Sequence, residues 1–221
     1  MTCLPCVEVQ TNPQIAASAA IIWLHGLGAD GHDFASLVPE LHLPVTLNVR
    51  FIFPHAPSIP VTINNGYVMP AWYDILEISL DRKIDVTQLC ASATQIQALI
   101  EREISRGIPS NKIILAGFSQ GGAVAYEAAL TFAKPLAGLL ALSTYFATSE
   151  TIVVNPANKQ LPILIQHGSE DGVVNEVLGQ LAYRQLSERG YNVAYESYLM
   201  EHSLCAEQIV AISNWLQEKL Q

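Results

Sequence analysis

Lysine and arginine are scarce in this sequence, which has 11 of them against 20 acidic residues and a formal net charge of −9. They form no cluster, and the first basic side chain is Arg50. Because nucleic acids and anionic membrane surfaces are bound through grouped basic side chains, we expect neither as a partner. A secretory signal begins with positive charge ahead of its apolar run, so we also expect no cleaved signal.

Long apolar runs and paired cysteines are missing as well. No segment is long and apolar enough to span a bilayer, so we expect no stable membrane insertion. Of the four cysteines, Cys90 and Cys205 stand alone, while Cys3 and Cys6 form a CxxC pair at an end that we predict to be unstructured. A structural zinc site needs a second ligand pair, so we interpret all four as reduced thiols of a cytoplasmic protein.

Apolar residues make up 50% of the 221-residue chain and charged residues 14%, which is enough for a large core. No repeat or linker divides the chain, so we expect one domain over residues 1–221. Apolar runs typical of buried strands alternate with helical periods. Strands are predicted at 19–25, 48–54, 112–118, 136–142, 162–167 and 192–199. Helices are predicted at 84–104, 121–134, 173–189 and 203–220, with a short helical period at 33–41.

Uniformly apolar strands interleaved with helices are typical of a parallel sheet that is covered on both faces. The sequence therefore predicts an α/β fold, a three-layer α-β-α sandwich with a mostly parallel central sheet. Ligands of such folds bind beyond the carboxyl ends of the strands, which is where we expect the functional residues.

The stretch from Gly117 to Gly121 reads Gly-Phe-Ser-Gln-Gly and matches G-x-S-x-G between a predicted strand and a predicted helix. The two glycines would allow a sharp turn where side chains would collide with the neighbouring strand and helix. This turn would present the Ser119 hydroxyl above the sheet, next to helix N–H groups that favour negative charge. The alternative is a glycine-rich turn of a nucleotide-binding fold, but G-x-G-x-x-G and G-x-x-x-x-G-K-[ST] are absent. We interpret Ser119 as a nucleophile.

A serine hydroxyl needs a neighbouring base, and in this topology an acid and then a histidine follow the serine along the chain. Only His167 and His202 lie downstream. With His167 as the base, we consider Glu150, in a polar loop, as the acid. With His202 as the base, Asp171 follows a strand and all three groups lie at strand ends, which we favour. Glu170 remains a rival for the acid, and for His167 we favour a structural bond to the backbone.

Acyl transfer builds negative charge on the carbonyl oxygen, and each preorganised N–H donor there stabilises the transition state by roughly 3 kcal/mol. One donor is expected from the residue after the nucleophile, Gln120, and another from an early loop after a strand. Leu27 is the candidate in that loop, because Gly26 and Gly28 on either side let the amide turn toward a ligand.

Six boxes occur in order along the chain: LHGLGADGHDF, FPHAP, MPAWYDI, GFSQGG, HGSEDGVV and EHSLC. Together they resemble the carboxylesterase and acyl-protein thioesterase family of α/β-hydrolases, from His25 to the last helix. The stretch PVTINNGYVMPAWYDI is more similar to bacterial carboxylesterases. The resemblance implies the α/β-hydrolase fold, Ser119, Asp171 and His202 as the catalytic triad, and Leu27 and Gln120 as oxyanion donors. It places the acid at Asp171, although Gly172 stands where many members carry proline.

We therefore expect a serine hydrolase that cleaves carboxylic esters of short to medium acyl chains through an acyl-enzyme intermediate, without a metal or an organic cofactor. The substrate would be a small-molecule ester or thioester. The segment 58–78 is interpreted as a cover over the site. Trp72 and Tyr73 in it are expected either to bind the acyl chain or to form an aromatic plug on the core.

The sequence is also compatible with two other functions. One is an acyl-protein thioesterase that acts on lipidated proteins. The other is a binding module without catalysis, which the presence of all three triad residues disfavours. Exposed apolar segments could also pair two chains as a homodimer.

Overall fold

A seven-stranded sheet forms the centre of the computed structural model, which describes residues 3–77 and 83–221. Its strands stand in the order β1-β3-β2-β8-β9-β10-β11. Among the described strands of this sheet, β1 pairs antiparallel with β3 and all the other neighbours are parallel. The bounds are β1 Cys6–Gln10, β2 Ala19–Leu24, β3 Val49–Pro54, β8 Ile113–Phe118, β9 Gly138–Leu142, β10 Ile163–Gly168 and β11 Val193–Tyr198.

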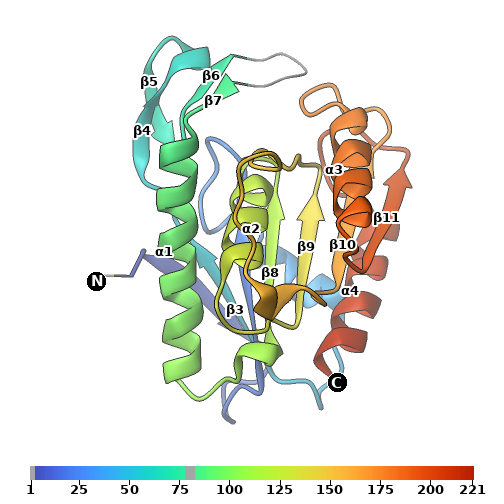
Figure 1. Cartoon of the computed structure of the whole chain (residues 1–221). Helices are drawn as coiled ribbons and strands as arrows, with labels where there is room; N and C mark the ends of the chain where they lie inside the picture. The colour runs from blue at the N-terminus through green and yellow to red at the C-terminus, as the bar shows by residue number, and fades with distance from the viewer. Residues whose placement is uncertain (1–2, 78–82) are drawn as a thin grey trace.

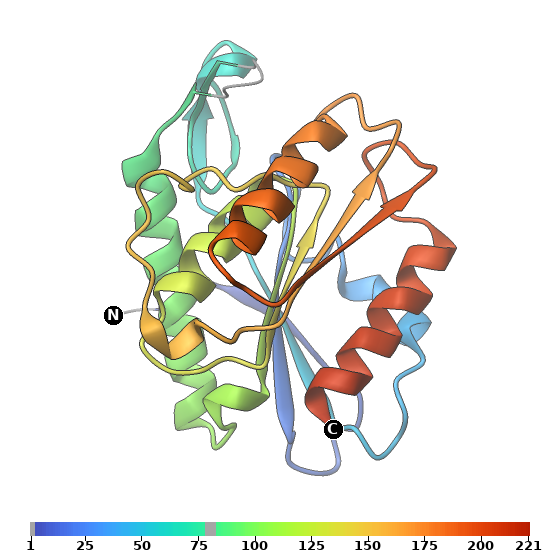
Figure 2. The same ribbon diagram turned by 45° about the vertical axis from the view of Figure 1, so that its right-hand side comes forward.

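Helices cover both faces of this sheet. Their bounds are α1 Val86–Ser105, α2 Gln120–Thr131, α3 Glu176–Glu188 and α4 Ala206–Leu220. Helices α1, α2 and α3 pack on one face, while α4 packs on the other together with two short 3₁₀ helices, η1 (Ala35–Leu37) and η2 (Pro39–Leu41). Figure 2 shows the sheet between these two layers. The predicted three-layer α/β fold with a mostly parallel sheet is confirmed.

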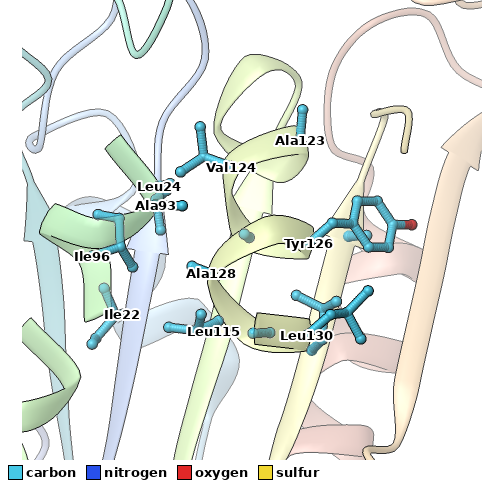
Figure 3. Packing of buried hydrophobic residues seen from close by; sticks show 14 of the residues in the cluster. Ile22, Leu24, Ala93, Ile96, Leu115, Ala123, Val124, Tyr126, Ala128 and Leu130 are labelled. Carbon is cyan, nitrogen blue, oxygen red and sulfur yellow. The ribbon is translucent and has the colours of Figure 1, made fainter. Parts of the chain in front are cut away.

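Burial on both faces explains why the strands read as uniformly apolar. Every residue of β2 is buried, with alternate side chains entering opposite layers: Ile22 packs toward α1 and α2, and Ile21 packs toward α4. Helix α2 packs beside α1 and against β8 and β9, where Figure 3 shows its side chains, and its residues 120–130 are all buried. An Ala-rich helix suits this position, because small side chains let it lie close to the strands.

Two small sheets project beyond the carboxyl ends of the parallel strands, at the top of Figure 1. One pairs β4 (Ser58–Val61) with β5 (Tyr67–Pro70), and 3₁₀ helix η3 (Thr62–Asn64) connects them. The other pairs β6 (Ile75–Glu77) with β7 (Lys83–Ile84). From the sequence we expected a cover in this region but predicted none of its strands. Part of the expected cover, residue 78, lies outside the described residues.

The N-terminal prediction was wrong, because the CxxC pair does not lie at an unstructured end. Cys6 begins β1, and burial raises the pKa of its thiol to about 11. All four cysteines are free. The helical period at 33–41 forms η1 and η2 rather than one α-helix, since Pro39 lacks the N–H that a continuous helix needs. In the described parts of the chain, no helix is long and apolar enough to cross a membrane.

Candidate active site

Ser119 lies at the junction of β8 and α2 in a strained backbone conformation, with φ 53° and ψ −122°. A positive φ is unfavourable for a residue with a side chain, at a cost of about 1–3 kcal/mol, and the surrounding structure must hold it. Here the Ser119 amide donates to the Leu142 carbonyl at 2.9 Å, and Thr144 Oγ1 donates to the Ser119 carbonyl at 2.6 Å. Both partners lie at or just beyond the end of β9, so the neighbouring strand fixes the turn.

Gly117 and Gly121 are required by close approach, as expected from the sequence. A Cβ at Gly117 would lie 2.5 Å from the Gly121 carbonyl oxygen, and a Cβ at Gly121 would lie 2.5 Å from the carbonyl oxygen of His25. Gly122 is crowded as well, because its Cβ would lie 2.5 Å from Thr144 Cγ2. Real Cβ atoms do not approach so closely, so this tight strand-to-helix turn excludes larger side chains.

His202 and Asp171 are hydrogen-bonded, with His202 Nδ1 donating to Asp171 Oδ2 at 2.7 Å. This bond leaves Nε2 as the ring atom that can accept a proton. The His202 ring also contacts Phe118, the residue before the serine, with ring centroids 4.6 Å apart. Within the described residues, Ser119 Oγ makes no hydrogen bond to His202, and such bonds are often long until substrate binds. The structure thus brings the three predicted triad residues to one end of the sheet.

The Asp171 carboxylate is buried, and both of its oxygens accept hydrogen bonds. Its Oδ1 accepts from the amides of Val173 and Val174 at 2.9 and 2.8 Å, while Oδ2 faces His202. Burial alone would raise the pKa of this carboxyl. The hydrogen bonds from His167, His202 and the Val174 amide outweigh burial, so the pKa lies well below the usual range. Asp171 is therefore an anion that holds and orients the histidine. Glu170 beside it is exposed.

His167 is completely buried at the end of β10. Its Nε2 donates to the Val174 carbonyl at 2.8 Å and lies 3.4 Å from Asp171 Oδ2. Its Nδ1 has no hydrogen-bond partner among the described residues. The His167 ring therefore holds the loop that carries Asp171 in place, which agrees with the structural role favoured from the sequence.

The two expected oxyanion donors lie beside the serine. A Cβ on Gly26 would lie 3.4 Å from the Ser119 Cβ, which places the Leu27 loop against the nucleophile. Gln120 is the first residue of α2, where helix amides lack an intrahelical partner. Among the described residues, neither the Leu27 amide nor the Gln120 amide donates to another group. Neither N–H group is thus engaged within the described protein, and their role as oxyanion donors stays a prediction.

His25 orients the Leu27 amide. Its Nε2 accepts from the Ala56 amide at 3.2 Å, so the ring proton is on Nδ1, which donates to the Gly26 carbonyl at 2.7 Å. In a trans peptide the C=O and N–H groups point in opposite directions, so holding the Gly26 carbonyl aims the next amide away from His25. Burial lowers the pKa of His25 from 6.5, which favours the neutral ring that this arrangement needs.

An apolar cavity of about 80 Å³ opens beside the serine. Its lining residues are Leu27, Ile63, Ile75, Ser119, Gln120, Tyr145 and Val173. Four of them were missed from the sequence, because Ile63, Ile75, Tyr145 and Val173 come from three segments that are distant along the chain. The segment 58–78 does contribute to this cavity, through Ile63 and Ile75.

Trp72 and Tyr73 are not in the lining of this cavity but are buried in the core. Trp72 Nε1 donates to the His25 carbonyl at 2.9 Å, and the Tyr73 hydroxyl lies 2.7 Å from that of Tyr145. Gln120 ties this segment to α2, since its side chain accepts from the Trp72 amide and donates to the Tyr73 carbonyl. The geometry favours the aromatic plug over direct substrate binding.

One group in the described part of the chain could offer three ligand atoms to a metal ion. Asp30, His32 and His55 place such atoms within 4.8 Å of one another, at the loop that follows Leu27. All three residues already make hydrogen bonds within the protein, because His32 Nδ1 lies 3.1 Å from Asp30 Oδ1 and His55 Nδ1 accepts from the Gly31 amide. The triad needs none of these residues, so metal-free catalysis stays a prediction.

A parallel sheet that carries a strained serine turn, with an acid and a histidine beyond neighbouring strands, defines an α/β-hydrolase. A model of the phospholipase/carboxylesterase family matches residues 4–220, and the chain belongs to this family of serine hydrolases.

Relatives and solved structures agree with this assignment. The chain is 42% identical over 214 residues to acyl-protein thioesterase 1 of Neurospora crassa, covering 92% of this chain and 87% of that protein. It is 36% identical to acyl-protein thioesterase 1 of Cryptococcus neoformans, covering 96% and 97%. Among solved structures, acyl-protein thioesterase 2 of Zea mays has a TM-score of 0.84 at 29% identity, with 97% and 99% covered. Arabidopsis thaliana SOBER1 has a TM-score of 0.86 at 30% identity, with 92% and 99% covered.

Proposed function

We propose that this protein hydrolyses acyl thioesters in which the leaving group is the cysteine thiol of a lipidated protein. The observation that carries the proposal is the likeness, at 36–42% identity, to proteins named acyl-protein thioesterase 1. This likeness supports the thioesterase reading over the hydrolysis of short to medium esters, which we placed first from the sequence. We further propose that the protein acts in the cytoplasm, where its four free cysteines stay reduced.

The proposed reaction begins with Ser119 Oγ attacking the thioester carbonyl carbon while His202 Nε2 takes the hydroxyl proton. The oxyanion that forms accepts hydrogen bonds from the Leu27 and Gln120 amides. As the C–S bond breaks, His202 returns the proton to the departing thiolate. Water, deprotonated by the same ring, then attacks the acyl-serine, and collapse of this second intermediate frees the carboxylic acid and restores the serine. Asp171 stays ionised throughout and stabilises the imidazolium.

The acyl chain is proposed to enter the apolar cavity beside the serine. At about 80 Å³ this cavity is small, so a long chain must extend beyond it. A groove of about 430 Å³ lies next to it, and Tyr145 lines both spaces. The groove also contains apolar side chains, including Val86, Phe146, Leu178 and Leu181. Displacement of Tyr145 would join the two into a path for a long acyl chain.

The test compares octanoyl and palmitoyl chains, each offered as a thioester and as an oxoester with matched leaving groups. After correction for the hydroxide-catalysed rate of each substrate, we expect the larger kcat/KM for the thioesters. Equal or larger values for the oxoesters would contradict the proposal and restore the esterase reading. Ser119→Ala serves as the control, because loss of all four activities assigns them to this site.

A further inference from the structure

A separate cavity, of about 390 Å³, lies on the opposite side of the triad from the apolar cavity. We call it the acidic groove, because its wall combines two carboxylates with apolar and small polar side chains. Its lining residues are Asp33, Phe34, Ser36, Leu37, Glu40, Phe118, His202, Ser203 and Leu204. Its apolar members pack with the α4 layer, whereas Leu27, Ile63, Ile75 and Tyr145 of the other cavity pack with the layer of α1, α2 and α3.

The position of His202 in the wall decides which half of a substrate this groove can hold. The histidine must deliver its proton to the leaving group, so the leaving group lies on the histidine's side of the scissile bond. The acyl half then lies on the other side, in the apolar cavity that Ser119 lines. The acidic groove is thus the place for the thiol-bearing half of the substrate.

The carboxylates of the groove are available to a ligand. Asp33 and Glu40 are exposed, and in the described part of the chain neither forms an ion pair with lysine or arginine. Two further exposed acids, Glu170 and Glu201, directly precede the triad residues Asp171 and His202. The rim of the site is therefore negative, and no described lysine or arginine lines the groove.

Most basic residues lie at the other end of the sheet. They precede or begin parallel strands, or they stand at the ends of helices that run back from the site: Arg50, Arg102, Arg106, Lys112, Lys134, Lys159, Arg189 and Lys219. The other described basic residues are Lys83, which pairs with Glu77, and Arg184 on α3. Such segregation of charge gives the catalytic end a negative potential that attracts cations and repels anionic partners.

We propose that the acidic groove binds a cationic peptide segment, so that the preferred thioester is an acylated cysteine with lysine or arginine nearby in the chain. This inference rests on the proposed thioesterase function and deepens it. Asp33 and Glu40 pair with the cationic groups, while Phe34, Leu37 and Leu204 contact the aliphatic stems of these long side chains.

The test uses two octanoyl-cysteine peptides that differ only in carrying lysines or glutamates beside the cysteine. For the unaltered protein at low salt, we expect kcat/KM to favour the lysine peptide by about three- to tenfold, as two exposed ion pairs allow. The preference should shrink when NaCl rises from about 0.02 M to about 0.5 M, because salt screens exposed charges. Equal rates, or faster cleavage of the glutamate peptide, would overturn the inference.

Substitution of the two groove carboxylates then tests whether they cause the preference for the lysine peptide. The double variant Asp33→Asn/Glu40→Gln should lose most of the preference, and the ratio of the two rates cancels any general effect on folding. Glu101→Gln/Glu218→Gln is the matched control, because it removes the same charge near the far ends of α1 and α4. A preference retained in the first variant, or lost equally in both, would reject the groove as its source. If neither peptide is cleaved at all, it is the proposed thioesterase function that fails, and the inference with it.

Discussion

His202 Nδ1 and Asp171 Oδ2 lie 2.7 Å apart, although 31 positions separate the two residues in the chain. The bond depends on the loop after β10, where the Val173 and Val174 amides hold the other carboxylate oxygen. Asp171→Asn would keep the shape of the side chain but could place an amide N–H where Oδ2 accepts from His202. Such an amide would donate to Nδ1 and favour the tautomer that carries its proton on Nε2, which cannot take the proton of Ser119. We expect kcat for p-nitrophenyl butyrate to fall by roughly 10⁴-fold, as in serine protease triads.

Glu170→Gln is the matched control for this substitution, because Glu170 is adjacent but exposed and should be nearly silent in the same assay. A loss below tenfold in Asp171→Asn, or equal losses in the two variants, would remove Asp171 from the assigned role.

The crowding at Gly121 leads to a prediction about the stability of the fold. A methyl group there would press against the carbonyl oxygen of His25, so Gly121→Ala should lower the free energy of unfolding by about 1–3 kcal/mol, the usual range for overpacking. A Cβ at Gly172 would meet no atom within 4 Å, and Gly172→Ala should change stability by less than about 0.5 kcal/mol. Urea unfolding followed by circular dichroism measures both, and similar values for the two would refute the account of the turn.

Burial of His25 leads to a prediction about how the free energy of unfolding depends on pH. Its folded-state pKa is lowered from 6.5 by burial, so the unfolded chain binds the proton more readily. The resulting stability is complete above pH 6.5 and is lost as the pH falls toward the lowered value. The unaltered protein should therefore lose more stability than His25→Gln between neutral pH and about pH 5. Parallel curves of unfolding free energy against pH for the two proteins would show that His25 does not contribute.

Metal removal should leave catalysis unchanged, because the proposed chemistry needs only the serine, histidine, carboxylate and backbone amides. We expect the kcat/KM for p-nitrophenyl butyrate to be the same before and after dialysis against a chelator. A loss that added zinc restores would instead direct attention to Asp30, His32 and His55.

The fold and the residues of the candidate triad could be predicted from the sequence because their signals are local or ordered along the chain. Strands buried on both faces must be apolar throughout, so β2 and β8 are visible as runs. The turn at Ser119 requires glycines at fixed positions, and the topology fixes the order of acid and histidine. In contrast, β1 is a half-buried edge strand, and β4 and β5 combine proline with exposed apolar residues, so neither gives a clear pattern.

The apolar cavity beside the serine was not accessible in this way, because it forms where separate loops meet. Ile63, Tyr145 and Val173 are unremarkable in sequence and come together only in the folded chain. Trp72 and Tyr73 were candidates for substrate binding because they are aromatic. In the structure their polar atoms form hydrogen bonds in the core, with the His25 carbonyl and the Tyr145 hydroxyl respectively. A residue type indicates that a side chain needs a partner, and the fold decides whether the partner is substrate or protein.

Reaction with a fluorophosphonate probe, followed by peptide mapping, tests most directly whether Ser119 is an activated nucleophile. We expect a single modified site at Ser119, with labelling abolished in Ser119→Ala and strongly slowed in His202→Ala. Circular dichroism of both variants would confirm that they fold. Labelling at another residue, or no labelling of the folded protein, would contradict the account.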